Sequence, residues 1–548
     1  MIRRRIQGAL EAAVREKYNT SEAAAGAVTP SDNPVRGDYA ANTALIFAHA
    51  VKKNPLEIAE ALRQKLQGNS DFEKIEIAPP GFINFWLSPA ALQEELKLVL
   101  EKKSDYGRGF LSERKRVQVE FISANPTGPL TLANGRGGFL GDALSRVLEA
   151  AGYDVEREYY INDAGNQILI LGKSLLAAHG MIPEEENFYK GSYIAAWADG
   201  NNDLMEKYKD EPMALGERAA DDFLRTIQEV IEKKARIRFD RLTSERKDIR
   251  GKAWIPKAIE IFEKEKALYE KDGARWLATT RFGDDKDRVA VTSDGFPTYF
   301  LADAAHYLET KTRGFEIKIN ILGPDHYGYV ARIQAAAKMI GLPVSHTIVT
   351  QAVRLMQGGK EMRMSKRKGV YVAFEELLDR VPLDVDRFFF LEKSPDTHID
   401  FDLDLAKERS VKNPVYYVQY AHARMESIFQ KAKNPGGSQN AKIPGGADIS
   451  TGHDAKLNLL NAPEELFLIK KLIQFPEVVE DTARDYHAQR LPQYALELAR
   501  AFHAFYEQHR VITDDTEVSA ARLALVGASQ IILKNTLALM GIGAPEKM

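Results

Sequence analysis

Cysteine is absent from this chain of 548 residues. Its absence excludes a disulfide framework, a zinc site built on cysteine and a catalytic thiolate. Apolar runs long enough to cross a bilayer are also lacking, so no membrane-spanning segment is expected. The chain begins Met1-Ile2-Arg3-Arg4-Arg5, and such a basic start is also found in targeting peptides. However, Glu11 and Glu16 lie in the stretch that would be apolar or free of acidic residues in a targeting peptide. The sequence therefore predicts an amphipathic helix at the N-terminus and a cytoplasmic protein.

A strong net charge is lacking too, because 75 Lys and Arg residues face 78 Asp and Glu residues, which leaves a net charge of −3. This balance argues against a protein that simply coats a polyanion. Basic residues do gather locally: residues 233–252 contain nine, and residues 354–368 contain several against the single acid Glu361. The first run is equally well explained as a solvated helix face.

The length predicts several domains rather than one core. Residues 1–106 combine helical spacing with two alternating runs, 75–77 and 82–86, which predicts a small α/β module. After residue 406 only helical periodicity remains, so residues 406–548 are predicted to form an all-helical bundle. The Gly- and Pro-rich stretch 434–452 predicts a flexible loop within that bundle.

Between these parts, strand-like runs, turns and helices alternate. The strand-like runs are residues 117–122, 155–161, 317–322 and 347–353. This order is typical of a parallel sheet with helices on its faces. We therefore predict an α/β, Rossmann-like catalytic domain over residues 107–405, with a largely helical insertion at about 173–290.

Residues 123–138 connect the first of these strands to the following helix and are rich in Gly and Pro. Free N–H groups at a helix N-terminus attract anions, and glycines let a phosphate approach the backbone. The segment matches neither the GxxxxGK[ST] loop nor the GxGxxG fingerprint. From its residues alone it is either a nucleotide site or a tight turn.

Five motifs are spread over nearly the whole chain. They are residues 123–138 with their continuation 159–167, Gly37-Asp38-Tyr39, residues 323–328, residues 363–369 and residues 413–424. Taken in their order along the chain, these motifs resemble those of the arginyl-tRNA synthetases, a family of class I. The resemblance implies that ATP, L-arginine and tRNA are the substrates, that residues 1–106 touch the tRNA, and that residues 406–548 bind the anticodon.

The chain departs from the family at the first signature. The family usually has His-x-Gly-His where this chain has Thr131-Leu132-Ala133-Asn134. Those histidines are understood to donate hydrogen bonds to the ATP phosphates as charge develops. A Thr hydroxyl and an Asn amide are also donors, so Thr131 and Asn134 are predicted to replace them without titrating near neutral pH. The methyl group of Ala133 takes space that glycine would leave for adenine, which predicts weaker ATP binding.

The second signature is Met364-Ser365-Lys366-Arg367. By resemblance, Ser365, Lys366 and Arg367 belong with Thr131 and Asn134 to the catalytic residues. An ammonium follows a moving charge, and a guanidinium holds phosphate in a fork, so both suit the departing pyrophosphate. A solvated basic loop is the alternative. The residues implied to bind ATP are Pro129, Ala133, Gly135, Gly323, Asp325, His326 and Met364.

A guanidinium substrate needs planar carboxylate acceptors. Glu120 ends the first strand, and Asp303 follows Tyr299 by four residues, which places both side chains on one helix face. Without the family, a residue such as Glu120 is more often a surface residue of an edge strand, and a pair such as Tyr299 and Asp303 is more often a capping or core pair. The residues implied by the resemblance to bind arginine are Glu120, Ser123, Asn125, Tyr299, Asp303 and Gln351.

Single-stranded RNA is recognised by stacking on aromatic side chains, and the C-terminal helices contain many of them. Most aromatics at such spacing are core residues, but Tyr417 and Tyr420 are predicted to lie near the anticodon.

The sequence as a whole predicts an arginine–tRNA ligase that forms arginyl-adenylate and pyrophosphate from ATP and then charges its tRNA. Mg²⁺ should accompany the triphosphate, no metal or prosthetic group bound by the protein is predicted, and the chain should be a monomer. A non-catalytic tRNA-binding or regulatory paralogue is the alternative, because the histidines are missing. A class I synthetase for another amino acid is a third hypothesis, and in it the predicted guanidinium acceptors would have a different role.

Overall fold

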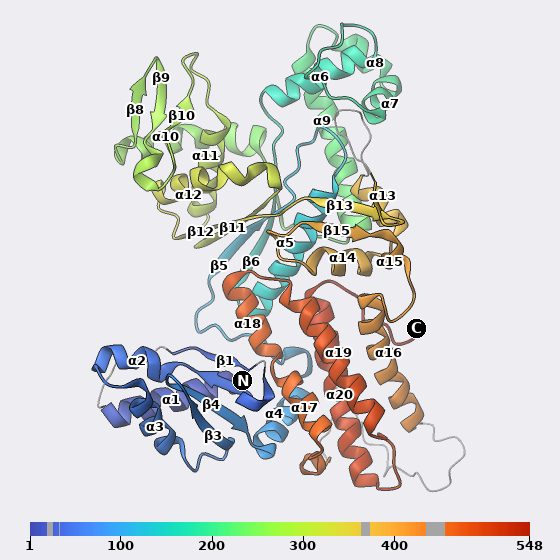
Figure 1. The fold of residues 1–548 in the computed structure, drawn as a ribbon. Helices are drawn as coiled ribbons and strands as arrows, with labels where there is room; N and C mark the ends of the chain where they lie inside the picture. Colours follow the sequence, from blue (N-terminus) through green and yellow to red (C-terminus); the bar gives the residue numbers. More distant parts are fainter. Residues whose placement is uncertain (19–25, 32, 363–372, 434–454) are drawn as a thin grey trace.

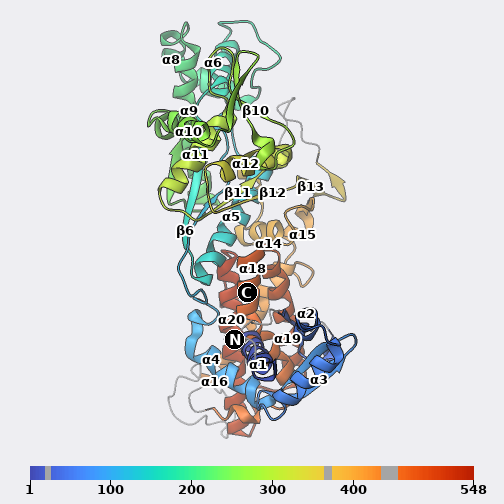
Figure 2. The ribbon, with the colours of Figure 1, turned by 90° about the vertical axis from the view of Figure 1, so that its left-hand side faces the viewer.

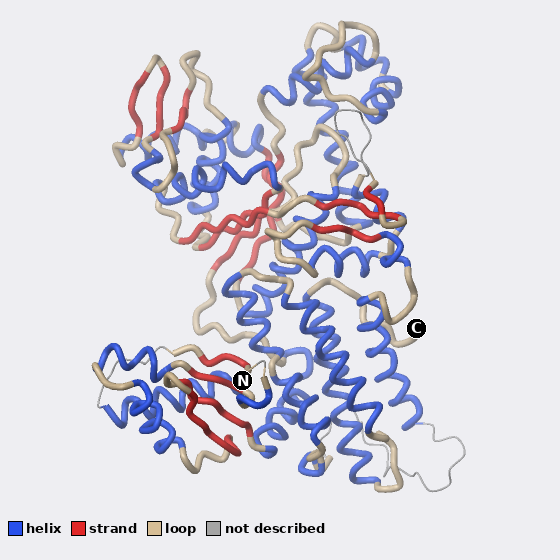
Figure 3. The backbone as a smooth tube through the Cα atoms, viewed as in Figure 1, coloured by secondary structure: helices blue, strands red, loops and turns tan. Residues whose placement is uncertain are grey.

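A computed structural model describes residues 1–18, 26–31, 33–362, 373–433 and 455–548 (Figure 1). The predicted loop at 434–452 and the second signature at 364–367 therefore lie outside the described residues. The N-terminal module and the C-terminal helices lie side by side below the central sheet, and two smaller lobes stand above it (Figures 1 and 2). Figure 3 shows that the strands are gathered in separate sheets and that the C-terminal part is helical.

The N-terminal module is an antiparallel sheet covered by helices, as the sequence predicts. The strand order is β1-β2-β4-β3. The elements are α1 (Ile2–Tyr18), β1 (Val28–Pro30), β2 (Tyr39–Ala41), α2 (Thr43–Val51), α3 (Pro55–Leu66), β3 (Phe72–Ala78), β4 (Phe82–Leu87) and α4 (Pro89–Lys102). Alternation in β4 buries Ile83, Phe85 and Leu87.

The catalytic domain is built on a parallel sheet of five strands in the order β12-β11-β5-β6-β7. Its strands are β5 (Arg116–Glu120), β6 (Asp154–Ile161), β7 (Arg241–Ser244), β11 (Ile317–Leu322) and β12 (Val344–Val349). Helix α5 (Leu132–Ala151) joins β5 to β6, and α12 (Val330–Met339) joins β11 to β12. Helix α11 (Tyr299–Thr312) precedes β11 and carries His306 and Thr310, which contact β6 and β5.

The predicted insertion is less helical than expected. It does contain α6 (Asn166–Ala178), α7 (Ser192–Gly200), α8 (Asn202–Lys207), α9 (Pro212–Glu229) and α10 (Trp254–Lys264). However, β7 joins the main sheet, and β8 (Leu268–Lys271), β9 (Ala274–Leu277) and β10 (Arg288–Val291) form a separate antiparallel sheet. These strands have four residues each and several charged positions, so their alternation is too short to stand out from a charged helix.

A small sheet and short helices connect the catalytic domain to the bundle. They are β13 (Val353–Gln357), β14 (Lys360–Glu361), α13 (Phe374–Arg380), α14 (Leu383–Leu391), β15 (Ile399–Asp402) and α15 (Leu403–Lys407). The run predicted as one strand at 347–353 is split between β12 and β13, which belong to different sheets.

The bundle consists of α16 (Pro414–Lys433), α17 (Pro463–Ile473), α18 (Phe475–Asp485), α19 (Arg490–Gln508) and α20 (Thr516–Leu539). Pro476 lies in the first turn of α18, where proline is tolerated, and it cannot continue the preceding helix. Helix α20 corrects one expectation: by length and composition it could cross a membrane. Its apolar residues pack inside the bundle against α4, α16, α17 and α19, which is the reason for its composition.

Charged residues join the N-terminal module to α18. The guanidinium of Arg3 bonds both Glu480 and Asp481. Glu477, which is almost fully buried, accepts hydrogen bonds from the backbone N–H of Arg3 at 3.2 Å and from the hydroxyl of Tyr39 at 2.9 Å. Burial raises the pKa of Glu477 to about 7, although Arg3 and these hydrogen bonds favour the ionised form. We call Arg3, Tyr39 and Glu477 the domain junction.

Candidate active site

The carboxyl ends of the parallel strands meet at one edge of the sheet, where open α/β sheets bind ligands. Ser123 and Asn125 follow β5, Gly323 follows β11 and Gln351 follows β12. The backbone turns sharply after β5, since Ile122 and Ser123 have φ of 66° and 36°. Such left-handed conformations in non-glycine residues are uncommon and concentrate at ligand sites. The structure therefore brings together side chains that the sequence separates by more than 200 residues.

Glu120 lies on the central strand, not on an edge strand, and is 6% exposed. Its Oε1 accepts a hydrogen bond from the hydroxyl of Ser123 at 3.2 Å. The same hydroxyl accepts a bond from the backbone N–H of Tyr160 at 3.1 Å. Ser123 is thus fixed between two strands and holds the carboxylate of Glu120 in place, which supports the predicted arrangement of these two residues.

A cluster of buried charges lies behind Glu120, and sequence reasoning missed it. Lys318 is fully buried on β11, with its Nζ 2.9 Å from Glu120 Oε2 and 3.3 Å from Glu158 Oε2. The Nε2 of His306 is 3.0 Å from the same Glu158 oxygen. Burial opposes both charges, but Glu120 and Glu158 raise the pKa of Lys318, and His306 and Lys318 lower that of Glu158. Lys318 and Glu158 are therefore both ionised at neutral pH.

A pattern in the strands could have revealed this cluster. Side chains alternate between the faces of a strand. In β5 the apolar Val117 and Val119 alternate with Gln118 and Glu120, and the register places Glu158 beside Glu120. Glu120, Glu158 and His306 have the donor types of a metal site and lie close enough for one. The ammonium of Lys318 already supplies the cation there, so we assign the three residues to the charge cluster.

Asp303 lies one turn into α11 and keeps a small accessible surface. Its Oδ2 accepts a hydrogen bond from the hydroxyl of Tyr329. Burial raises the pKa of Asp303 to about 7; the Tyr329 bond opposes this rise, and the negative charge of Glu120 adds to it. A carboxyl group with this pKa next to a second carboxylate is suited to a cationic ligand. The nearby Tyr299 is 47% exposed, so it is not a core residue.

Thr131 and Asn134 form a reciprocal cap at the N-terminus of α5. Thr131 Oγ1 accepts a bond from the backbone N–H of Asn134 at 3.4 Å, and Asn134 Oδ1 accepts one from the backbone N–H of Thr131 at 2.9 Å. The Thr131 hydroxyl also donates to Asn134 Oδ1 at 2.7 Å. The hydroxyl proton is thus engaged within the cap, and the carboxamide Nδ2 of Asn134 is the better placed donor for a phosphate.

The other residues predicted to bind ATP occupy two segments. Pro129 and Ala133 are half-buried on either side of Thr131. Gly135 is buried against the ring of Phe374, which a Cβ at this position would overlap, so packing explains the glycine. Gly323 precedes the 3₁₀ helix η6 (Pro324–Tyr329), in which Asp325 and His326 are exposed.

The ends of the predicted arginine site are held differently. Asn125 is exposed in the turn after β5. The backbone of Gln351 is clamped, because its N–H donates to Pro395 at 2.8 Å and its carbonyl accepts from Arg136 at 2.7 Å. Arg136 also donates to the carbonyl of Ser394 at 2.8 Å and is almost fully buried. Arg136 therefore fixes the strand end that carries Gln351, and sequence reasoning missed this residue.

Aromatic side chains gather on the bundle where tRNA contact is predicted. Tyr420 and His503 are stacked at 6.0 Å, and Tyr417 lies 5.0 Å from the same imidazole ring. Arg424 donates to the Tyr420 hydroxyl at 2.9 Å, and its guanidinium lies over Tyr420 and Tyr506. These half-buried rings on α16 and α19 offer stacking surfaces beside a cation.

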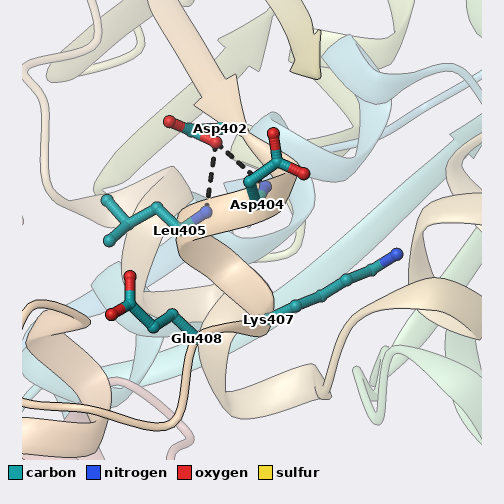
Figure 4. A pocket seen from close by; sticks show the side chains of 5 residues that line it. All are labelled: Asp402, Asp404, Leu405, Lys407 and Glu408. Atoms are coloured by element: carbon teal, nitrogen blue, oxygen red, sulfur yellow. Dashed lines mark hydrogen bonds between the residues drawn. The ribbon is translucent and has the colours of Figure 1, made fainter. Parts of the chain in front are cut away.

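A surface hollow beside α15 lies apart from these residues. Asp402, Asp404, Leu405, Lys407 and Glu408 line it (Figure 4). Asp402 caps α15 by accepting from Asp404 N and Leu405 N, and Asp404 accepts from Gly358 N. These carboxylates stabilise the local backbone, and none of the predicted ligand residues lines the hollow.

Known proteins resemble this chain over its full length. Residues 1–87 match the arginyl tRNA synthetase N terminal domain, residues 95–402 match the tRNA synthetases class I (R) catalytic domain, and residues 418–548 match the DALR anticodon binding domain. An arginine–tRNA ligase of Symbiobacterium thermophilum is 41% identical, covering 93% of this chain and 92% of that protein. One of Heliobacterium modesticaldum is 40% identical over 100% and 99%.

A solved structure agrees in fold. The arginyl-tRNA synthetase of Thermus thermophilus superposes with a TM-score of 0.77 and covers 100% of both chains at 24% identity. With the sequence matches, this fold shows that the chain belongs to the arginyl-tRNA synthetase family of class I.

Proposed function

We propose that this protein ligates L-arginine to its tRNA, and that Glu120 and Asp303 recognise the guanidinium group. The observation that carries the proposal is this carboxylate pair, in which Glu120 at the end of β5 acts electrostatically on Asp303 in the first turns of α11, within a class I catalytic domain. A guanidinium offers five N–H donors in a plane, and two carboxylates accept them in pairs. Lysine would leave acceptors in the pocket unpaired, and such unpaired groups reject a near-substrate strongly.

The remaining predicted residues have roles at the other end of arginine. Tyr299 packs over the guanidinium, while Ser123 supports Glu120. Asn125 and Gln351 hold the α-amino and carboxyl groups, which places the carboxylate toward the N-terminus of α5. There the carboxylate oxygen attacks the α-phosphate of ATP, and pyrophosphate leaves.

The nucleotide binds along the strand ends with Mg²⁺ as part of the substrate. Gly323, Asp325 and His326 hold the adenosine, Pro129, Ala133, Gly135 and Met364 line the site, and Asn134 and Thr131 face the phosphates. Lys366 and Arg367, with Ser365, stabilise the pyrophosphate as charge moves onto it. These loop residues lie outside the described residues, so their role rests on the resemblance of the motif.

The terminal ribose of tRNA then takes the arginyl group from the adenylate. Residues 1–106 contact the outer corner of the tRNA, and Tyr417 and Tyr420 contact the anticodon region. We expect a cytoplasmic monomer that requires tRNA even for the first step. The retained pair Glu120 and Asp303 argues against a non-catalytic paralogue, because RNA binding alone needs no guanidinium site.

The test is aminoacylation with ATP, radiolabelled arginine and total tRNA at neutral pH, with lysine and citrulline in parallel reactions. We expect arginyl-tRNA and no lysyl or citrullyl product. Tight tRNA binding without any arginyl-tRNA would favour the non-catalytic paralogue, and charging with another amino acid would overturn the assignment of the pocket.

A further inference from the structure

The hydroxyl of Tyr329, a residue that sequence reasoning did not single out, contacts the proposed arginine pocket. It donates to Asp303 Oδ2, although Tyr329 belongs to η6 and Asp303 to α11. The guanidinium of Arg332, on the next helix, lies 5.0 Å from the centre of the Tyr329 ring and supports it from α12. The guanidinium of Arg332 thus helps to hold the Tyr329 ring, and with it the hydroxyl, in position.

Helix η6 is also the segment proposed to bind adenosine. Gly323 precedes it, and Asp325 and His326 are exposed on it, three or four residues before Tyr329. The rings of His326 and Tyr329 are 6.3 Å apart. Because η6 has only six residues and a 3₁₀ helix rises about 2 Å per residue, Tyr329 lies within about two turns of Asp325 and His326. One short helix therefore contacts both substrate sites.

We propose that Tyr329 is a positioning residue that couples the binding of ATP to the binding of arginine through its hydrogen bond to Asp303. The proposal rests on the proposed function, in which Asp303 binds arginine and η6 binds adenosine. When ATP fixes η6, the hydroxyl holds the Asp303 carboxylate ionised and aligned for the guanidinium. Arginine in turn holds Asp303 and, through it, η6.

The bond leaves room for the substrate. A carboxylate has about four lone-pair positions, and Tyr329 uses one of them. The rest remain for the N–H donors of the guanidinium, so Tyr329 and arginine bind Asp303 together and do not compete. Coupling between two ligands is reciprocal, hence each substrate must raise the affinity for the other by the same factor.

The test measures the dissociation constant of arginine by calorimetry, with and without a non-hydrolysable ATP analogue, in the presence of tRNA. We expect the analogue to tighten arginine binding by roughly 5- to 10-fold in the unaltered protein. Tyr329→Phe keeps the ring and its packing on Arg332, and should reduce this ratio to below about twofold. The matched control is Tyr327→Phe, which removes a hydroxyl from the same helix at a residue that is 76% exposed.

Three outcomes decide the matter. A reduced ratio in Tyr329→Phe alone, with an unchanged melting temperature, supports the coupling. An unchanged ratio in Tyr329→Phe overturns it. Asp303→Asn separates this failure from failure of the proposed site. If Asp303→Asn binds arginine normally, Asp303 is not a ligand of arginine. If Asp303→Asn loses arginine binding while the ratio in Tyr329→Phe is unchanged, the proposed site stands and only the coupling is rejected.

Discussion

Two carboxyl groups in this protein, Asp303 in the proposed arginine pocket and Glu477 at the domain junction, both have a pKa raised to about 7. In each case burial is the main cause. Their surroundings differ, however. Glu477 accepts two hydrogen bonds from the N-terminal module and lies near the guanidinium of Arg3, so its neighbours are supplied by the fold. Asp303 accepts one bond from Tyr329 and lies near the negative Glu120, and no ion pair with a cation is found for it among the described residues.

The comparison extends to the charges nearby. Behind Glu120, Lys318 provides an internal cation that lies 2.9 Å from Glu120 and 3.3 Å from Glu158 and lowers the pKa of Glu158. No equivalent cation bonds Asp303 among the described residues. The proposed pocket therefore combines one carboxylate that is paired within the fold with one carboxyl group whose pKa lies near neutral pH. The neighbours of Glu477 come from the fold itself, whereas Asp303 has room for a cationic ligand, as perturbed groups at functional sites often do.

The largest expected effect comes from removing the internal cation. Lys318→Met removes the ammonium bonded to Glu120, which keeps only the His306 imidazole 3.8 Å away, while Arg241 and Arg313 still lie near Glu158. Breaking this buried pair should lower the free energy of unfolding by about 3–5 kcal/mol. Thermal and urea unfolding measure this change. Lys338→Met, at an exposed lysine, is the control and should stay within about 0.5 kcal/mol. Equal melting temperatures for the two variants would show that Lys318 does not stabilise the cluster.

Removing the charge of Asp303 should affect catalysis more than folding. Asp303→Asn keeps the shape and can still accept a bond from Tyr329, but it leaves the guanidinium only one anion. We expect kcat/KM for arginine to fall on the order of 10²–10³-fold, mostly through KM. Glu477→Gln removes the same kind of charge at the domain junction and should leave KM unchanged. A similar KM in Asp303→Asn and the unaltered protein would contradict the assignment.

The pH dependence of arginine binding follows from the pKa of Asp303, which is raised to about 7. Only the ionised form pairs with the guanidinium, so affinity is gained as pH rises through 7 and is lost below it. KM for arginine should be about tenfold higher at pH 6 than at pH 8. Tyr329, Glu120, Glu245 and His306 are the charged or titratable groups around Asp303. A flat KM profile, measured by aminoacylation across this range, would show that Asp303 stays ionised throughout.

The smallest effect is expected at the domain junction. Because the pKa of Glu477 is raised on folding, the folded state keeps a proton that the unfolded chain loses, and stability falls as pH rises toward 7. Glu477→Gln removes this titration, so the melting temperature should depend less on pH between 5 and 7. At pH 8 its stability should differ by about 1 kcal/mol or less. A slope that does not change would place the titrating group elsewhere.

Local patterns predicted most of the fold. Alternating residues correctly indicated β3, β4, β5 and β6, and helical spacing indicated the C-terminal bundle. The pattern failed where elements are short or interrupted. Four-residue strands such as β7 carry too little alternation, and Pro476 divides one apolar run into α17 and α18.

The sequence by itself determined the motifs and the departure at Thr131 and Asn134, and it led to the prediction that Glu120 and Asp303 are the acceptors. Those features are local, because spacing on one strand or one helix places them. Only the tertiary structure decided that Lys318 neutralises Glu120 and that Tyr329 bonds Asp303. These contacts depend on strand register and on the packing of helices against the sheet, and residues far apart in the chain carry no local sign of either.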